Sequence, residues 1–188
     1  MSGDISDKWS SVVSITKQEV PIANISAPGG WNDMDMLEVG VKMGMTTTEY
    51  TSHFSIWAAM KSPLILGNDV TNMTSDIKNI ISNKEVIAIS QDSLGASVEQ
   101  RWVKGDTQLF AGPLSRNGYV ALFWNQGNST TNMTGSWSDI FNKPNANIHK
   151  SIAVRDLWEH KDMGAYKGSI TVSVEPHGVR LLRFSGQA

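Results

Sequence analysis

The chain has 188 residues, of which 40% are hydrophobic, and a formal net charge of −2. This composition is typical of a globular protein of one large or two small domains, and no apolar run approaches the roughly 18 residues that cross a bilayer. A near-neutral charge without basic clusters excludes the electrostatic surface that binds nucleic acid. The absence of cysteine excludes disulfides, thiolate nucleophiles and zinc–thiolate sites.

The first half of the chain is predicted to alternate between helices and short apolar strands, which is the pattern of α/β proteins. Thr46 and Glu49 have the spacing of a capping box, so a helix should begin there and stop before Pro63. Further helices are predicted over residues 7–20, 75–81 and 84–90. Short buried strands are expected over residues 29–33 and 63–66.

Near residue 95 the pattern changes to short alternating runs separated by glycine, asparagine and proline, as in a β-sandwich. Strands are predicted over residues 107–111, 119–124, 151–158, 169–174 and 178–184. The stretch 125–135 is rich in serine, threonine and asparagine and is predicted to be a polar loop. We therefore place a domain boundary near residue 95, with an antiparallel β-domain after it.

Four N-x-S/T sequons favour a secreted glycoprotein. Their asparagines are Asn24, Asn72, Asn128 and Asn132. A single sequon often arises by chance as a polar turn, but four in 188 residues, two of them almost adjacent, carry more weight. The first residues are neither basic nor apolar and do not resemble a signal peptide. If the protein is secreted, we expect this chain to be an internal piece of a longer precursor.

Three aspartates of the first half, Asp4, Asp33 and Asp35, lie at the ends of apolar segments, where polar residues of α/β proteins can reach a ligand. Paired carboxylates can hydrolyse a glycosidic bond, because one protonates the leaving oxygen while another stabilises the oxocarbenium-like centre. Asp4 can equally be a helix N-cap, and the Asp33–Asp35 pair can be a divalent-metal site of a transferase or a turn held by Asx hydrogen bonds. The scattered histidines show no metal-site spacing.

Four motifs resemble, in order and spacing, the C-terminal half of an α-galactosidase of glycoside hydrolase family 27, the melibiase family, and especially its fungal members. They are GDISDKW, PGGWNDMDMLEVG, WAAMKSPLILGND and EVIAISQDSLG. The family usually has proline in place of Met34 and again in place of Ser93, which are conservative departures in position. The resemblance implies the last part of a (β/α)8 barrel over residues 1–95, then an antiparallel β-sandwich over residues 96–188, with no cofactor or metal.

The resemblance also implies a retaining double-displacement mechanism on terminal α-D-galactosyl residues of galactose-containing oligosaccharides or polysaccharides. Asp4 takes the position of the general acid/base. Asp35 takes the position of the ligand for the sugar hydroxyls, and Met36 lines the pocket beside it. The supporting shell at the same strand end consists of Trp31, Asn32 and Asp33.

The family places its nucleophile on the fourth barrel strand, upstream of the acid/base, and this chain has no counterpart for it. We therefore expect the chain to be inactive alone and to need the N-terminal part of the same enzyme as a partner. Two alternatives stay open. One is a non-catalytic carbohydrate-binding or interaction module, and the other is an α-N-acetylgalactosaminidase of the same family, because the residues that separate the two sugar specificities are also outside this chain.

Overall fold

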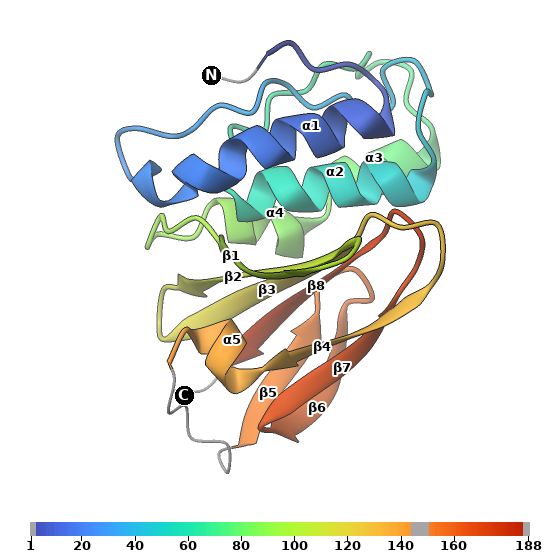
Figure 1. Ribbon diagram of the computed structural model, residues 1–188. Helices are drawn as coiled ribbons and strands as arrows, with labels where there is room; N and C mark the ends of the chain where they lie inside the picture. The colour runs from blue at the N-terminus through green and yellow to red at the C-terminus, as the bar shows by residue number, and fades with distance from the viewer. Residues whose placement is uncertain (1–2, 144–150, 186–188) are drawn as a thin grey trace.

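A computed structural model describes residues 3–143 and 151–185 of the chain. Figure 1 shows a layer of helices stacked on one face of a β-sheet, with a smaller sheet on the other face. None of the helices in this described part is long and apolar enough to cross a membrane.

The helical layer forms where the sequence predicts it. It comprises α1 (Trp9–Glu19), the 3-10 helix η1 (Val20–Ile25), α2 (Thr47–Ala59), α3 (Ser75–Ile81) and α4 (Lys84–Ser90). The predicted capping box is confirmed, because the Glu49 amide donates to Thr46 Oγ1 at 3.2 Å and the Thr46 amide donates to Glu49 Oε2 at 2.8 Å. The capping box determines where α2 begins, and the helical period then determines which of its residues face the core.

Parallel strand pairing is reduced to one bridge among the described residues, between Leu37 and Leu66. The Leu37 amide donates to the Ile65 carbonyl at 2.8 Å, and the Gly67 amide donates to the Leu37 carbonyl at 3.0 Å. The prediction of a strand over residues 29–33 is wrong, because Gly30 instead closes a tight bridge with Ala27. The prediction of a buried strand over residues 63–66 is wrong as well, because the segment is reduced to the bridge at Leu66 and both Ile65 and Leu66 are exposed. A parallel strand needs neighbours to complete its ladder, and the described residues supply one at most for this segment.

The second half of the chain forms two antiparallel sheets. Their strands are β1 (Glu99–Lys104), β2 (Thr107–Leu114), β3 (Gly118–Asn125), β4 (Thr131–Ser136), β5 (Ser151–Asp156), β6 (Lys161–Lys167), β7 (Ser169–Val174) and β8 (Val179–Ser185), with the short helix α5 (Trp137–Phe141) after β4. The larger sheet has the order β1-β2-β3-β8-β5-β6, and β4 pairs with β7 in the smaller one. The antiparallel β-sandwich predicted from the sequence is confirmed.

The prediction of a polar loop over residues 125–135 is wrong at its end, where β4 begins at Thr131. Met133 and Gly135 are buried between the sheets, while Asn132 and Thr134 face outward. Only one large apolar side chain lies on the inner face of this strand, so the sequence shows no alternation of apolar and polar residues there.

The central strands β2 and β3 of the larger sheet are buried on both faces, whereas its edge strands β1 and β6 are not. Phe110 and Trp124 pack against the helices, whereas Leu109 and Phe123 pack against β4 and β7. This alternation follows from the pleat of a strand, which points successive side chains to opposite faces. Since one hydrophobic core contains both helical and sheet residues, the boundary near residue 95 stays a prediction.

Candidate active site

The fold brings the segment that carries Asp4 against the segment that carries Asp35. The amide of Ile5, the residue after Asp4, donates to Asp35 Oδ2 at 2.8 Å across 30 positions of sequence. The Asp4 side chain is exposed beside this contact. The two segments that carry the aspartates singled out by the sequence are therefore adjacent in space.

Asp35 has an unusual backbone and a carboxylate held by amides. Its φ angle is +74°, in the left-handed region that residues other than glycine rarely adopt. Besides the bond from Ile5, Asp35 Oδ1 accepts from the Met36 amide at 2.7 Å. A carboxylate has about four lone-pair positions, so the half-buried Asp35 side chain keeps acceptor capacity for hydroxyl groups of a ligand.

Each of the three residues predicted to support the site has a contact in the structure. Asp33 Oδ1 accepts from the Asp35 amide at 2.9 Å. This is the Asx turn, one of the alternatives for the Asp33–Asp35 pair. Asn32 Nδ2 donates to Glu19 Oε1 and, at 2.8 Å, to the Ile22 carbonyl. Trp31 lies against Gly95, where an added Cβ would come within 2.9 Å of its ring.

Helix α2 supplies contacts that sequence reasoning missed. The Trp57 indole Nε1 donates to the Asp35 carbonyl at 2.8 Å, and the Glu38 amide donates to His53 Nε2 at 3.0 Å. From the sequence, both side chains are expected only to pack in the core or serve as structure. Their spacing of four residues on a capped helix shows that they share a face, but it does not reveal which loop they contact.

Two acidic groups next to the segment 32–35 have a raised pKa, Glu19, which accepts from Asn32, and Glu38. Burial raises the pKa of Glu19, and burial followed by repulsion from Asp7 raises the pKa of Glu38. Burial lowers the pKa of His53 to about 3, so its imidazole is neutral at physiological pH. Because His53 Nε2 accepts a hydrogen bond, its single proton is on Nδ1. In the part of the chain that the structure describes, no group of three or more His, Asp or Glu side chains is arranged to hold a metal ion.

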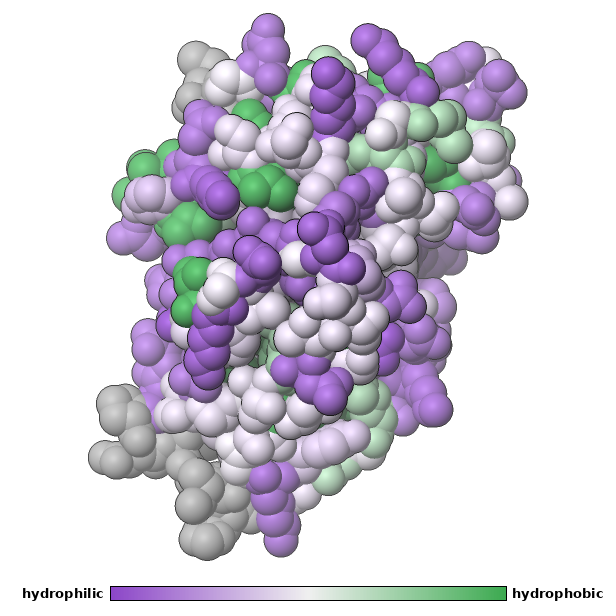
Figure 2. All heavy atoms as spheres, turned by 45° about the vertical axis from the view of Figure 1, so that its right-hand side comes forward, coloured by the Kyte–Doolittle hydropathy of each residue, from purple (hydrophilic) through white to green (hydrophobic). Residues whose placement is uncertain are grey.

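Large apolar side chains are exposed on the segments that carry or adjoin Asp35. Trp31 and Met36 are 43% and 42% exposed, and Ile65 beside the parallel bridge is 59% exposed. Figure 2 shows that hydrophobic residues on the visible face gather mainly on the upper, helical part of the molecule. Large apolar residues that cluster on a surface mark a region that another surface covers.

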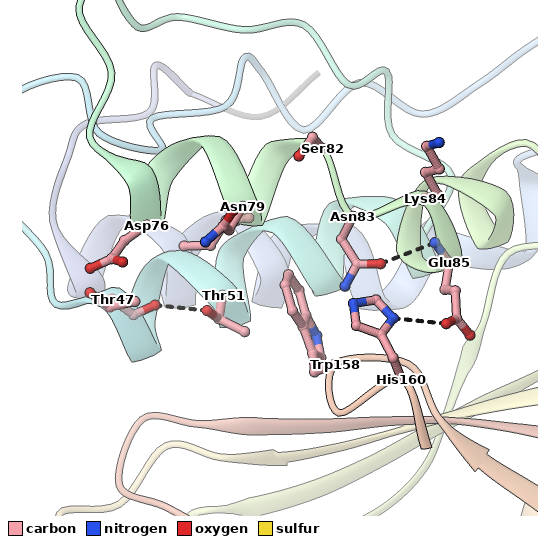
Figure 3. Close-up of a pocket in the computed structure, with 11 residues that line it drawn as sticks. Thr47, Thr51, Asp76, Asn79, Ser82, Asn83, Lys84, Glu85, Trp158 and His160 are labelled. Atoms are coloured by element: carbon pink, nitrogen blue, oxygen red, sulfur yellow. Dashed lines mark hydrogen bonds and ion pairs between the residues drawn. The ribbon is translucent and has the colours of Figure 1, made fainter. Parts of the chain in front are cut away.

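A cavity of about 830 Å³ lies elsewhere, at the junction between the helices and the sheet. It contains none of the predicted site residues. As Figure 3 shows, Trp158 and His160 project toward α2, α3 and α4. Many of its polar groups are already engaged: Asn83 Oδ1 accepts from two amides of α4, Asn83 Nδ2 donates to the Leu157 carbonyl, and Thr51 donates to the Thr47 carbonyl. Since these polar groups are engaged and Asp4 and Asp35 lie elsewhere, the cavity is a poor match for hydrolysis of a glycosidic bond by the predicted carboxylates.

Glu85 of α4 ties the helices to the sheet beside this cavity. Arg155 donates to its carboxylate from Nε at 2.6 Å and from Nη2 at 2.8 Å, and His160 Nδ1 lies 2.8 Å from Oε1. The Arg155 hydrogen bonds, followed by that of His160, lower the pKa of Glu85 to about 2. Because the folded pKa is depressed, the ionised carboxylate stabilises the fold above its unfolded pKa, and this contribution disappears as the pH falls toward 2.

Glu85→Gln should remove this pH-dependent stabilisation. At pH 7 the variant is expected to melt roughly 2–4 °C below the unmodified chain, and the difference should shrink between about pH 5 and pH 2. Calorimetric melting curves at several pH values measure it. Glu159→Gln is the control, since that carboxylate is exposed and its ion pair with Arg180 is long, at 3.6 Å. A difference in melting temperature between Glu85→Gln and the unmodified chain that stays constant over this pH range would contradict the stabilising role of the ionised Glu85.

Comparisons with known proteins agree with the fold and with the motifs. The family model described as Alpha galactosidase A matches residues 2–92, and the model described as Alpha galactosidase C-terminal beta sandwich domain matches residues 104–184. Alpha-galactosidase 2 of Arabidopsis thaliana is 42% identical over 180 residues, which are 96% of this chain and 44% of the relative.

Solved structures give the same result. The crystal structure of alpha-galactosidase I from Mortierella vinacea, a fungal enzyme, has a TM-score of 0.92 and 51% identity, over 95% of this chain and 45% of that one. The alpha-galactosidase of Saccharomyces cerevisiae solved with raffinose has a TM-score of 0.86 and 25% identity, over 93% of this chain and 51% of that one. This chain thus spans about half the length of the relatives that it matches.

Proposed function

Because this chain belongs to the α-galactosidases of glycoside hydrolase family 27, we propose that it is the C-terminal part of a retaining enzyme that removes terminal α-D-galactosyl residues from galactosides. The hydrogen bond from the Ile5 amide to the Asp35 carboxylate carries the proposal, because it joins the residue after the proposed acid/base to the proposed sugar ligand. The relative from Saccharomyces cerevisiae, solved with raffinose, supports a galactose-containing oligosaccharide as the substrate.

In the proposed reaction Asp4 acts twice. It first protonates the glycosidic oxygen while a carboxylate nucleophile attacks the anomeric carbon, and it then removes a proton from the water that hydrolyses the glycosyl–enzyme ester. Asp35 accepts hydrogen bonds from galactose hydroxyls through its remaining lone pairs, and the exposed Met36 covers the sugar. The sugar is thereby held against Asp4 for both steps.

We propose that the nucleophile comes from the N-terminal part of the same enzyme, which completes the barrel. The single parallel bridge at Leu37 and Leu66 supports this, because its backbone ladder can continue through further parallel strands. The exposed Trp31 and Ile65 support it as well, since further strands and helices would cover them.

Turnover of an aryl α-galactoside tests the proposed function. The chain alone is expected to release no galactose, because one carboxylate cannot serve as both nucleophile and acid/base. A chimaera that joins the unmatched part of the Mortierella vinacea enzyme to residues 3–188 of this chain is expected to release it. Galactose release by the chain alone at a rate comparable to intact enzymes of the family, or a folded chimaera without turnover, would contradict the proposal.

The same assay separates the two alternatives. Because the residues that separate the two sugar specificities lie outside this chain, only the parent enzyme with its own N-terminal part can decide between them, and faster hydrolysis of an α-N-acetylgalactosaminide than of the α-galactoside by that enzyme would assign the other specificity. Galactose binding by the 188-residue chain that persists in its Asp4→Asn and Asp35→Asn variants, without turnover in the chimaera, would favour a carbohydrate-binding module. The second outcome needs no contribution from Asp4 or Asp35, so it is distinct from the proposed function.

We propose in addition that the parent protein is a secreted glycoprotein. The asparagines of all four sequons are exposed: Asn24, Asn72, Asn128 and Asn132. Expression in a secreting fungal host should therefore give a chain whose mass falls on treatment with a peptide N-glycosidase. The chain made in a bacterial cytoplasm is the control. An unchanged mass of the secreted chain would contradict the proposal.

A further inference from the structure

We propose that Trp57 is a positioning residue for Asp35. Its indole N–H holds the backbone of Asp35 in the left-handed conformation that aims the carboxylate at the sugar. The kinetic part of this inference rests on the proposed function of Asp35, whereas its structural part does not.

The backbone of Asp35 needs such support. A side chain at a φ of +74° is sterically unfavourable, and it persists where surrounding contacts fix it. Trp57 is 0% exposed, and its Nε1 donates to the Asp35 carbonyl at 2.8 Å. Breaking that bond would leave a polar group unpaired in a dry environment, so the bond strongly restrains the peptide that follows Asp35.

His53 secures Trp57 and the far end of the same segment. Its ring is fully buried and meets the Trp57 ring edge-on, with 4.0 Å between the centroids. Its Nε2 accepts from the Glu38 amide at 3.0 Å. Two side chains one turn apart on α2 therefore fix residues 35–38 to a rigid helix, which is how a scaffold keeps a ligand-binding side chain in place.

The direction of the Asp35 carboxylate depends on this backbone. Its two oxygens accept from the Ile5 and Met36 amides, and both bonds require the present orientation of the side chain. If the backbone of Asp35 turned to a negative φ, the carboxylate would leave both amides. Trp57 thus controls the contact between the Asp4 and Asp35 segments without touching either carboxylate.

The test compares Trp57→Phe with Trp124→Phe. Both tryptophans are 0% exposed, but the Trp124 Nε1 has no hydrogen-bond partner among the described residues. The two substitutions therefore remove the same atoms from the core, and only the first one removes a hydrogen bond to the site.

The first readout is hydrogen exchange of the Ile5 and Met36 amides in the 188-residue chain. Trp57→Phe should accelerate exchange at both amides by about tenfold, which corresponds to about 1.4 kcal/mol, in line with the loss of one buried hydrogen bond. Trp124→Phe should leave these rates unchanged. Equal exchange rates in the two variants would overturn the inference.

The second readout is the kinetics of the chimaera. Trp57→Phe should raise KM for the α-galactoside by about tenfold with little change in kcat, as expected when a sugar contact common to ground and transition states is weakened. A general loss of folded protein would lower the apparent kcat instead, and equal KM values in the two variants would overturn the kinetic part. If the unmodified chimaera shows no turnover, the proposed function fails, while the exchange comparison still decides the role of Trp57.

Discussion

Replacing Asp4 with asparagine is expected to lower kcat/KM of the chimaera by roughly 10²–10⁴-fold on raffinose or another substrate with a poor leaving group. Asparagine keeps the size of the side chain but cannot donate the proton that the departing oxygen needs. In an aryl galactoside whose phenol is strongly acidic, the phenolate can leave without this proton. Formation of the glycosyl–enzyme from that substrate should therefore be much less affected. Steady-state rates on the two substrates measure the contrast.

The contrast between substrates separates chemistry from folding. A misfolded variant would lose activity on both substrates equally, whereas loss of acid catalysis depends on the leaving group. Asp106→Asn is a matched control, because Asp106 is exposed in the turn between β1 and β2, within the sheet half of the chain. If Asp4→Asn hydrolysed raffinose as fast as this control, Asp4 could not be the acid/base.

Replacing Asp7 with asparagine is expected to lower the free energy of unfolding by about 2–4 kcal/mol. Asp7 is 6% exposed, and its carboxylate accepts from the Lys42 amide at 2.7 Å, from the Gly44 amide at 3.1 Å and from the Tyr50 hydroxyl at 2.8 Å. Both amides bind Oδ2, so asparagine can keep them on its single acceptor oxygen, but it puts an NH2 group in the place of Oδ1 beside the Tyr50 hydroxyl and removes the charge that strengthens these hydrogen bonds. Urea unfolding at pH 7, followed by tryptophan fluorescence, measures the loss.

The same substitution has a spectroscopic readout at Tyr50. Burial, followed by the hydrogen bond to Asp7, raises the pKa of Tyr50 to about 12. Asp7→Asn should lower this pKa, because the negative partner that favours the protonated phenol is gone. Asp162→Asn is the control, since Asp162 is 82% exposed and its ion pair with Arg155 should contribute less than about 1 kcal/mol. An Asp7→Asn variant as stable as this control would contradict the anchoring role.

Asp7 also links stability to the candidate site. It lies three residues after Asp4 and binds two amides of the loop that follows Asp35, so it connects the two segments. Gly44 shows how close this packing is, because a Cβ there would lie 2.2 Å from the Asp7 carbonyl oxygen. The segment that carries the proposed acid/base is therefore positioned by a buried carboxylate and not by a regular element.

Local patterns in the sequence were enough to predict most of the elements. The capping box of Thr46 and Glu49 and the helices over residues 75–81 and 84–90 depend on contacts within one or two turns, which the sequence shows directly. The strands with clear apolar alternation were equally accessible. β4 was missed because its inner face carries only Met133 and Gly135, and the strand predicted over residues 29–33 was wrong because a parallel strand depends on neighbours that local pattern does not show.

For the site, the order and spacing of four motifs were sufficient to identify the family and to single out Asp4 and Asp35. Only the tertiary structure decided what holds them, namely the left-handed backbone of Asp35, the Ile5 amide on its carboxylate and the two side chains of α2 behind it. The physical reason is range. Helix caps and strand alternation are set by residues two to four positions apart, whereas the buried hydrogen bonds of the site join groups 15 to 30 positions apart, and their partners are determined only when the chain has packed.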